Sequence, residues 1–470
     1  MVYFWHLKVR KKAAQMPENP LGYEKIPTLL RRFAVPSITA MLVGSLYNIV
    51  DQIFIGQGVG YLGNAATNVS YPLSTICLAI SLLIGVGSSS RFSLCLGRKE
   101  TDQAAKIAGN GIILMGIVGV LYAIVGELFL LPLLRVFGAT PDILPYAREY
   151  AGITLLGMPF LIVTNGLSNL IRADGSPKYS MLCMVAGAIA NTILDPIFIF
   201  LFQWGVFGAA LATVLGQILS FFLAIRYLRR FRTIRLERRH FRLDLRDELR
   251  TCAMGISSCV NQVGITFVQI VLNNSLTYYG AQSVYGTDIP LAACGIVMKT
   301  NAILISIIVG ISQGSQPIIG FNYGARQYRR VRDTFLLAIK LNLTVSAVGF
   351  VLFHFFPQYI ILLYGTGDAL YFEFAIRFMR VFLFMVLLNG VQMLSSNFFT
   401  AIGKALKGLL LSLTRQVFFL IPLALILPLW LGISGIMLAG PIADFAAFLL
   451  SAFLVYRELK RQKGLSPAQP

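Results

Sequence analysis

The sequence predicts an all-α integral membrane protein with twelve transmembrane helices in two six-helix bundles. Apolar residues make up 56% of its 470 residues. Charged residues make up 13%, about half of the roughly 25% found in soluble domains. A water-soluble chain of this length has too little interior to bury so many apolar side chains. Twelve apolar stretches are also long enough, at roughly 20 residues each, to cross a hydrocarbon core about 30 Å thick.

The predicted spans follow one another with short connections, and a transmembrane β-barrel would show short alternating segments instead. The first six spans are 33–56, 69–95, 107–133, 147–171, 179–203 and 207–228. The second six are 252–279, 290–319, 333–356, 375–401, 408–431 and 435–456. These spans divide the chain into five parts. They are a basic N-terminal segment (1–32), an N-lobe (33–228), a cytoplasmic linker (229–251), a C-lobe (252–456) and a cytoplasmic tail (457–470).

The two halves share a weak internal repeat. Gly87 and Gly97 recur as Gly314 and Gly324, at a constant offset of 227 residues. Matches at a constant offset indicate duplication. Because each half contains an even number of helices, both copies enter the membrane in the same direction. They are therefore predicted to be related by a pseudo-two-fold axis along the membrane normal.

The positive charges predict the orientation of the spans. The formal net charge is +20, and 33 of the 40 Lys and Arg residues lie in the two termini and the loops after even-numbered spans or within a few residues of them. Four lie in or within a few residues of the loops after odd-numbered spans. Since positively charged loops stay on the cytoplasmic side, we expect both termini to be cytoplasmic in a multi-pass protein of the inner or plasma membrane. Topology and anionic lipid account for the charge, so no nucleic-acid partner is expected.

The motifs that would indicate an enzyme are missing from the sequence. Its three histidines are widely scattered, and its six cysteines form no CxxC pair, so neither a histidine-based hydrolase nor a zinc site is predicted. Paired-acid motifs and nucleophile elbows are also lacking. We expect no enzymatic activity and no cofactor, apart from H⁺ or Na⁺ as a coupling ion. Two like bundles facing a central cleft favour transport by alternating access, in a protein that acts as a monomer.

Two aspartates within the predicted spans are candidates for a cation site. A charge at the bilayer centre costs about 2.5–3.5 kcal/mol on insertion scales, which points to a function. Asp51 lies in the first span, and Asp195 lies in the fifth, one turn after Asn191. Pro196 disfavours α geometry at Asp195, so we expect a carbonyl near Thr192 to lose its helical partner. The carboxylate, the amide and the freed carbonyl would then offer oxygen atoms to a proton or a small cation.

The neighbouring spans extend this hypothesis. Thr213, on the sixth span, is placed to add a hydroxyl group. The second-half spans 252–279, 290–319 and 408–431 contain no Asp or Glu, so coupling is predicted in the N-lobe. The alternative, that each aspartate only holds helices together by hydrogen bonds, stays open.

Four further residues are candidates for the substrate cleft. Tyr47 and Asn48 precede Asp51 by four and three residues and therefore share its helix face. Lys299 is predicted to be the one deep cation of the second half, either paired with an acid or facing the cleft. Met393 belongs to a group of Met and aromatic side chains that suit an adaptable apolar pocket. The role of Asp444, also within a span, is left open.

Three segments resemble a known family. Residues 48–56 (NIVDQIFIG) resemble the first-helix signature of the MATE family (multidrug and toxic compound extrusion), and residues 314–325 (GSQPIIGFNYGA) resemble its eighth-helix signature. Residues 172–178 (RADGSPK) resemble the loop between its fourth and fifth helices. The resemblance implies a twelve-helix secondary transporter that expels organic cations in exchange for Na⁺ or H⁺.

The resemblance also implies which residues hold the coupling ion. In the prokaryotic branch that couples through the N-lobe, the site has an Asp on helix 1, an Asn and an Asp on helix 5, and a Thr on helix 6. The matching residues, which would also be the Na⁺ ligands if Na⁺ is the coupling ion, are Asp51, Asn191, Asp195 and Thr213. A further Asn on helix 4 matches either Asn165 or Asn169. Another branch carries an acid on helix 7, which this sequence lacks there.

The function predicted from these observations is multidrug efflux. The protein would export amphipathic or organic cationic compounds in antiport with H⁺ or Na⁺, a route to antibiotic resistance. Drug and ion must then prefer different conformational states. The alternative is a flippase for a lipid-linked precursor, since related superfamilies share such bundles. Those proteins usually have fourteen helices and a cationic cavity, so twelve spans with few deep Lys or Arg residues favour the exporter.

Overall fold

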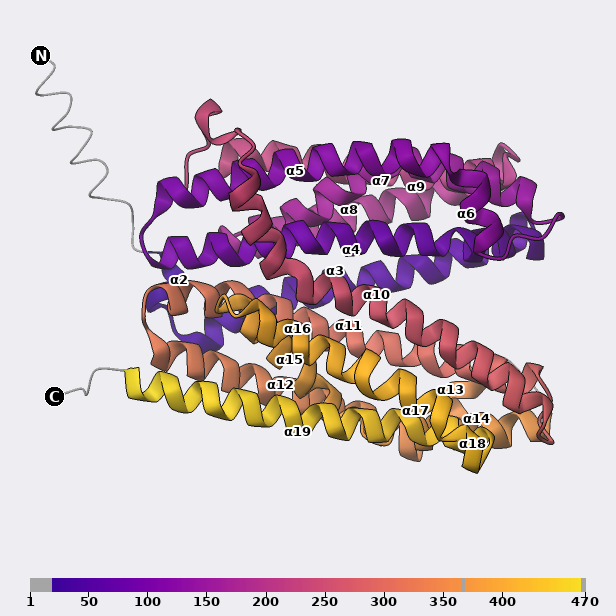
Figure 1. The fold of residues 1–470 in the computed structure, drawn as a ribbon. Helices are drawn as coiled ribbons and strands as arrows, with labels where there is room; N and C mark the ends of the chain where they lie inside the picture. The colour runs from indigo at the N-terminus through magenta and orange to yellow at the C-terminus, as the bar shows by residue number, and fades with distance from the viewer. Residues whose placement is uncertain (1–18, 365–367, 466–470) are drawn as a thin grey trace, which may run out of the picture.

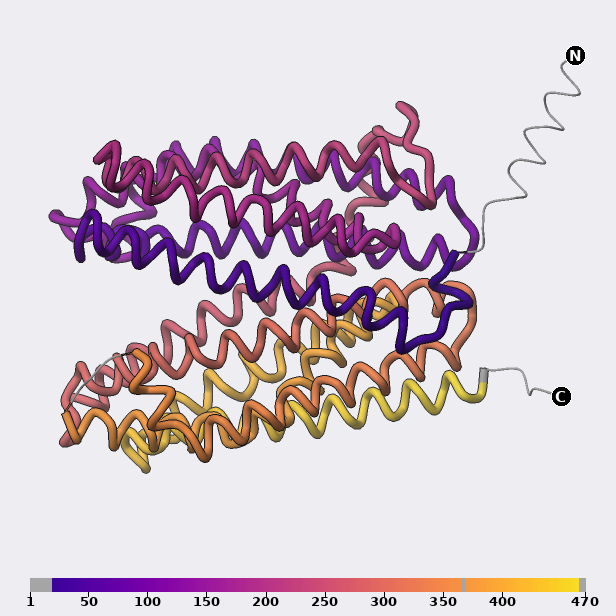
Figure 2. The backbone as a smooth tube through the Cα atoms, turned by 180° about the vertical axis from the view of Figure 1, so that it is seen from behind, coloured from indigo at the N-terminus to yellow at the C-terminus, as the bar shows by residue number. Residues whose placement is uncertain are grey.

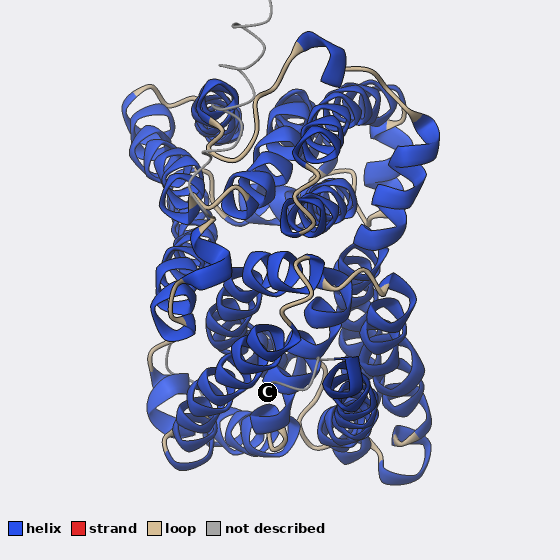
Figure 3. Ribbon diagram, turned by 90° about the vertical axis from the view of Figure 1, so that its left-hand side faces the viewer, coloured by secondary structure: helices blue, strands red, loops and turns tan. Residues whose placement is uncertain are grey.

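The computed structural model describes residues 19–364 and 368–465. Within these ranges the chain is built from helices without any β-strand, and the helices gather into two bundles (Figure 3). The predicted fold class is therefore confirmed. Residues 1–18 of the predicted N-terminal segment and residues 466–470 of the predicted tail lie outside the described residues.

Six spans form the N-lobe, which lies at the top of Figure 1 in indigo to magenta. They are α3 (Ile26–Gly58), α4 (Tyr61–Gly97), α5 (Thr101–Leu128), α7 (Leu144–Ala173), α8 (Pro177–Pro196) with the π-helix η1 (Ile197–Leu201), and α9 (Gly205–Arg226). The short helices α2 (Pro20–Tyr23) and α6 (Leu130–Val136) complete this half. The linker that follows contains two short 3₁₀ turns, η2 (Tyr227–Arg230) and η3 (Arg238–His240).

The C-lobe repeats this order of spans with more breaks. Its long helices are α10 (Leu245–Ala281), α11 (Asp288–Gly324), α12 (Tyr328–Phe355) and α19 (Ile433–Leu465). The tenth span is two helices that meet at 47°, α14 (Ala369–Phe382) and α15 (Val386–Ala401). The eleventh runs through α16 (Ala405–Leu413), the π-helix η4 (Thr414–Leu420), α17 (Ile421–Ile426) and α18 (Pro428–Leu431), and α13 (Pro357–Leu362) connects α12 to α14.

Every predicted span corresponds to one of these helices, with the tenth as the bent pair. Several helices start earlier than hydropathy predicts. Residue 252 is the predicted start of the seventh span, yet α10 begins at Leu245, where the Asp244 side chain accepts a hydrogen bond from the backbone N–H of Asp247. A polar turn with a capped N-terminus continues a helix without adding apolar residues, so hydropathy does not detect it.

The lobes meet at the end of the molecule where α2 begins and α19 ends, and they diverge toward the other end (Figures 1 and 2). The first helix of each lobe makes this contact by packing on the opposite lobe. α3 runs beside α11, and α10 runs beside α4. The larger buried apolar cluster follows the same junction, because it extends from the N-lobe into α11, α12 and α15. A second buried cluster belongs to the C-lobe.

The repeated glycines lie at these crossings. A Cβ on Gly87 of α4 would lie 2.1 Å from the Thr251 carbonyl oxygen of α10, and one on Gly314 of α11 would lie 2.7 Å from the Ala34 Cα of α3. Both distances are too short for a side chain. Since α3 and α10 are the first spans of their lobes, and α4 and α11 the second, the two contacts are equivalent under the pseudo-two-fold axis. The glycines that recur between the two halves are therefore also the glycines at which the lobes pack against each other.

A buried carboxylate of the N-lobe anchors the start of the linker between the lobes. Asp174 follows α7 and accepts hydrogen bonds from the Tyr227 hydroxyl at 2.7 Å and from the backbone N–H groups of Arg232 and Thr233 at 2.7 and 3.0 Å. The Thr233 hydroxyl also donates to it. A buried carboxylate with four donors fixes the backbone of an otherwise irregular segment.

Replacing Asp174 is expected to loosen this linker. Asp174→Ala leaves buried donors without an acceptor, which costs about 2–4 kcal/mol of stability. We expect a lower Tm in detergent and faster tryptic cleavage near Arg232. Asp142→Ala, at an exposed loop position, is the control and should leave both unchanged. Equal cleavage rates for Asp174→Ala and the unaltered protein would contradict the anchoring role.

Candidate functional site: a central cavity and buried aspartates behind its wall

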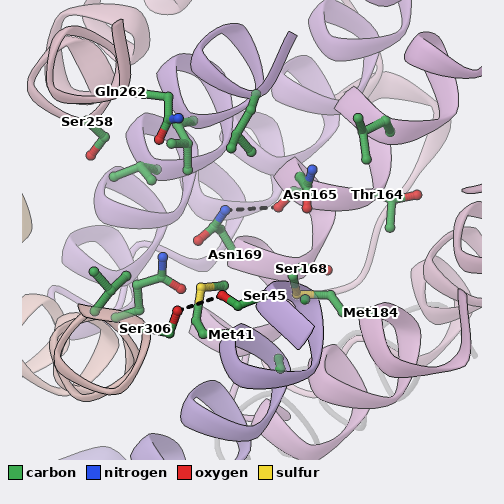
Figure 4. A pocket seen from close by; sticks show the side chains of 18 of the residues that line it. Met41, Ser45, Thr164, Asn165, Ser168, Asn169, Met184, Ser258, Gln262 and Ser306 are labelled. Atoms are coloured by element: carbon green, nitrogen blue, oxygen red, sulfur yellow. Dashed lines mark hydrogen bonds between the residues drawn. The ribbon is translucent and has the colours of Figure 1, made fainter. Parts of the chain in front are cut away.

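A cavity of about 530 Å³ lies between the two lobes, within the range of pockets for drug-sized molecules. Helices α3, α4, α7, α8 and α9 line it from the N-lobe, and α10, α11, α15 and α16 line it from the C-lobe. The lobes touch within it where the hydroxyls of Ser45 and Ser306 lie 2.7 Å apart (Figure 4). Both lobes thus contribute to one binding space.

The polar part of the lining consists mainly of amides and hydroxyls. The amide side chains are Asn48, Asn165, Asn169, Asn191, Gln217, Asn261, Gln262, Gln313, Gln316, Gln392 and Asn397. Methionines and aliphatic side chains such as Met41 and Met184 supply the apolar part (Figure 4). Such a lining offers hydrogen bonds in many directions together with soft apolar contact, which suits ligands of varied shape.

The two predicted aspartates come together in the N-lobe. Asp51 of α3 is 8% exposed and Asp195 of α8 is 0% exposed. Their carboxyl groups lie within hydrogen-bonding reach of each other. Asn191 donates through Nδ2 to Asp195 Oδ1 at 3.2 Å and to Thr213 Oγ1 at 3.2 Å. The structure thus gathers into one cluster four residues that are separated by up to 162 positions in the chain.

This cluster, which we call the acidic cluster (Asp51, Asn191, Asp195 and Thr213), forms part of the cavity wall and extends behind it. Asn191 and Thr213 line the cavity, as does Tyr47, and Asn191 also contacts Asp195 on the far side. The two carboxylates themselves do not line it. An ion therefore has one layer of polar side chains to cross between the cavity and the carboxylates.

Oxygen atoms of the acidic cluster are left without hydrogen-bond partners. Asp51 Oδ1, Asp195 Oδ2 and Asn191 Oδ1 are buried, and no described residue donates to them. Buried polar atoms are nearly always paired, so three unpaired oxygens in one place indicate a site for something the protein binds. Carboxylate and amide oxygens are suitable ligands for a hard cation, and a carboxylate pair also suits a shared proton.

The helix that carries Asp195 differs from its prediction. We expected Pro196 to disrupt α geometry at Asp195, but α8 continues through both residues, so that prediction was wrong. The irregularity comes afterwards, as the π-helix η1. Pro196 lacks an N–H but leaves the preceding residue in the helix, as proline-kinked helices do, and the wider π turn takes up the mismatch.

Tyr150 of α7 was not anticipated from the sequence. Its hydroxyl interacts with the Thr213 hydroxyl, and it lies close enough to Asp51 and Asp195 to interact with them electrostatically. It also packs against the small apolar cluster around Ile55. Sequence reasoning missed it because one Tyr near the start of a span gives no sign of the helix it will face.

The other predicted site residues divide by location. Asn48 and Met393 line the cavity, as do both helix-4 candidates, Asn165 and Asn169. Asn169 Nδ2 donates to the Asn165 carbonyl oxygen at 2.9 Å, so the two are near neighbours and neither is singled out (Figure 4). Lys299 is exposed, lies outside the lining and forms no ion pair with the described residues.

Lys299 is not the one deep cation of the C-lobe. Arg415, in η4, has a side chain that is 11% exposed and pairs with the buried Asp444 of α19, with Nε 2.6 Å from Oδ1. The prediction overlooked Arg415 within an otherwise apolar span. The same contact gives Asp444 a definite partner, at the place where the eleventh span leaves α geometry.

Breaking this ion pair should destabilise the C-lobe. Asp444→Asn leaves the mostly covered Arg415 guanidinium without its counter-charge, which is expected to cost about 3–5 kcal/mol. The double replacement Arg415→Met with Asp444→Leu removes both charges and should recover most of the loss. Thermal unfolding in detergent measures both. A double variant no more stable than Asp444→Asn would show that the pair matters for more than charge balance.

The comparisons with known proteins agree with this architecture. The MatE family model matches residues 36–197 and 258–426, one region in each lobe. The multidrug export protein MepA of Staphylococcus aureus (strain COL) is 25% identical over 94% of this chain and 96% of its own. The probable multidrug resistance protein YoeA of Bacillus subtilis (strain 168) is 24% identical over 90% of this chain and 91% of its own.

Solved structures show the same fold. The MATE multidrug transporter DinF-BH is 33% identical, with a TM-score of 0.86 over 94% of this chain and 98% of that one. A MATE family transporter in an outward-facing conformation is 24% identical, also with a TM-score of 0.86, over 94% of this chain and 99% of that one. The chain therefore belongs to the MatE family of multidrug efflux transporters.

Proposed function

We propose that this protein is a secondary active exporter that exchanges H⁺ or Na⁺ for amphipathic, often cationic, organic compounds. The observation that carries the proposal is the acidic cluster, with its unpaired carboxylate oxygens one residue layer behind a drug-sized cavity. Ion binding there would neutralise charge on α3 and α8, two helices that also line the cavity. Coupling therefore needs no long relay between the two sites.

The proposal assigns the structure to one step of alternating access. With both termini on the cytoplasmic side of the plasma membrane, the lobes are joined at the cytoplasmic end and diverge outward (Figure 1). This is the state in which substrate leaves and an ion enters from outside. Each charge that moves inward through a potential of 100 mV supplies about 2.3 kcal/mol toward returning the lobes. We further propose that one monomer carries out the full cycle.

The test is drug transport in everted vesicles with the two gradients imposed separately. A pH gradient or a Na⁺ gradient, but not a potential without either ion, should drive uptake of a fluorescent dye. The effective gradient identifies the ion. Dye uptake that is indifferent to both gradients would refute antiport, and scrambling of a lipid-linked precursor in the same vesicles would support the flippase instead.

A further inference from the structure

The charge within the central cavity is positive. Arg172, near the end of α7, lines the cavity and is 5% exposed. Among the described residues the lining contains neither Asp nor Glu, and Arg172 is its one charged member. The two aspartates of the acidic cluster are behind the wall, and Asp174, close to Arg172 in sequence, turns its carboxylate to the linker. A purely cationic ligand would thus meet a fixed positive charge.

The Arg172 guanidinium is held by neutral partners. Nη1 donates to Gln313 Oε1 at 2.6 Å and to Ser37 Oγ at 3.4 Å, and Nη2 donates to Asn169 Oδ1 at 3.3 Å. It forms no ion pair within residues 19–364 and 368–465. Three of its five N–H groups are used, which leaves one on Nη2 and the one on Nε for another acceptor. A buried arginine without a counter-ion is costly, so a function is indicated.

The contact with Gln313 crosses between the lobes. Arg172 belongs to α7 of the N-lobe and Gln313 to α11 of the C-lobe, close to the Gly314 crossing where the lobes meet. When the lobes separate at this end, Gln313 must leave and Arg172 loses an acceptor. The vacated position then faces the side from which substrate enters. In this structure Gln313 Oε1 occupies, at Nη1, one of the positions that an acidic group of a ligand would take.

We propose that Arg172 is the receptor for a carboxylate carried by amphipathic substrates, and that Gln313 displaces this carboxylate when the lobes close. The proposal rests on the proposed export function and adds one specificity to it, a preference for those amphipathic substrates that carry a carboxylate beside their other groups. A guanidinium binds a carboxylate through two parallel hydrogen bonds, whereas one amide oxygen accepts one strong bond. In the closed state Gln313 competes for the guanidinium, which lowers the affinity for the carboxylate there and favours release on the far side.

The test uses two dyes that differ at one group. Rhodamine B carries a free carboxylate, and its ethyl ester has the same ring system with that charge removed. Binding to purified protein is followed by fluorescence anisotropy, and export is followed in everted vesicles. We expect rhodamine B to bind more tightly than the ester. Arg172→Gln should lower the affinity for rhodamine B about tenfold or more and change the affinity for the ester less than about threefold.

Two further variants separate a receptor from a structural contact. Arg172→Lys keeps the charge and should retain part of the preference for rhodamine B. Gln313→Leu removes the competing acceptor and should raise affinity for rhodamine B but not for the ester. If Arg172 only joins the lobes, Arg172→Gln and Gln313→Leu will instead change the affinities for both dyes by the same factor. That result overturns the proposal. Full displacement of rhodamine B by added phosphatidylglycerol would also overturn it, in favour of a lipid headgroup.

The outcome also separates this inference from the proposed function. Gradient-driven export of both dyes without any preference that depends on Arg172 refutes the carboxylate receptor and leaves antiport intact. Binding of rhodamine B that depends on Arg172, with no export under either ion gradient, supports the receptor and refutes antiport. If neither dye binds, the carboxylate receptor is refuted.

Discussion

Asp195→Asn is expected to reduce ion-driven export to background while leaving the protein folded. Asp195 is fully buried, and one of its oxygens has no partner among the described residues. The amide keeps the side-chain volume, so packing on α9 is preserved. It removes the charge that a coupling ion neutralises, and with it the difference between ion-bound and ion-free states that exchange requires. Asp51→Asn should have the same effect, because the two carboxyl groups form one site.

The measurement is dye efflux from cells and uptake by everted vesicles, with the amount of protein and its Tm recorded in parallel. We expect efflux to fall about a hundredfold or more, because a state that is no longer coupled cannot be driven by the gradient. The Tm should stay equal or rise, since an unpaired buried carboxylate is destabilising. Asp288→Asn, at an exposed acid where α11 begins, is the control and should export normally. Normal export by Asp195→Asn would eliminate the acidic cluster as the coupling site.

A second large effect is expected at the crossing of α4 and α10. A Cβ at Gly255 would lie 1.8 Å from the Leu83 carbonyl oxygen. Because the obstacle is backbone, Gly255→Ala forces the helices apart. Overpacking of this kind costs about 1–3 kcal/mol in the state where the lobes touch and nothing in the state where they are separated. The conformational equilibrium should therefore shift by about tenfold or more toward separation of the lobes at the end where α2 begins and α19 ends.

Export by Gly255→Ala should fall accordingly, and a cysteine introduced near the contact should react faster with a water-soluble thiol reagent. Gly314→Ala also meets backbone, at the equivalent crossing of α11 and α3, and should behave alike. Gly295→Ala, also on α11, is the control because its Cβ would meet nothing within 4 Å. A Gly255 variant with normal export and unchanged reactivity would show that the lobes do not need this contact.

Much of the architecture was predictable because it depends on local composition. The cost of placing polar groups in lipid fixes the number and length of the spans, so hydropathy located all twelve. The repeat of Gly87 as Gly314 is visible in the printed sequence. Hydropathy does not detect the part of a helix that extends beyond the hydrocarbon, as in α10. It also does not detect a bend within a span, as between α14 and α15.

The acidic cluster was partly predictable for a similar reason. An aspartate within a span is rare enough to be noticed, and its helical neighbours follow from the period of the helix, which led to Asp51, Asn191 and Asp195. Tyr150 and the pair of Arg415 with Asp444 escaped prediction, because their partners come from helices distant in sequence. A single tyrosine or arginine in a span does not show which neighbour it faces.

The sequence by itself determined that this chain is a helical membrane protein made of two like halves, with acids deep in the first half. The spans and the deep acids follow from the free energy of transferring side chains into lipid, which each residue carries independently of its neighbours, and the like halves follow from residues repeated at a constant offset. Only the tertiary structure decided that the carboxylates lie behind the cavity wall and that Arg172 is the charge within the cavity. Both depend on the rotation and crossing of packed helices, which are set by contacts between residues far apart in the chain.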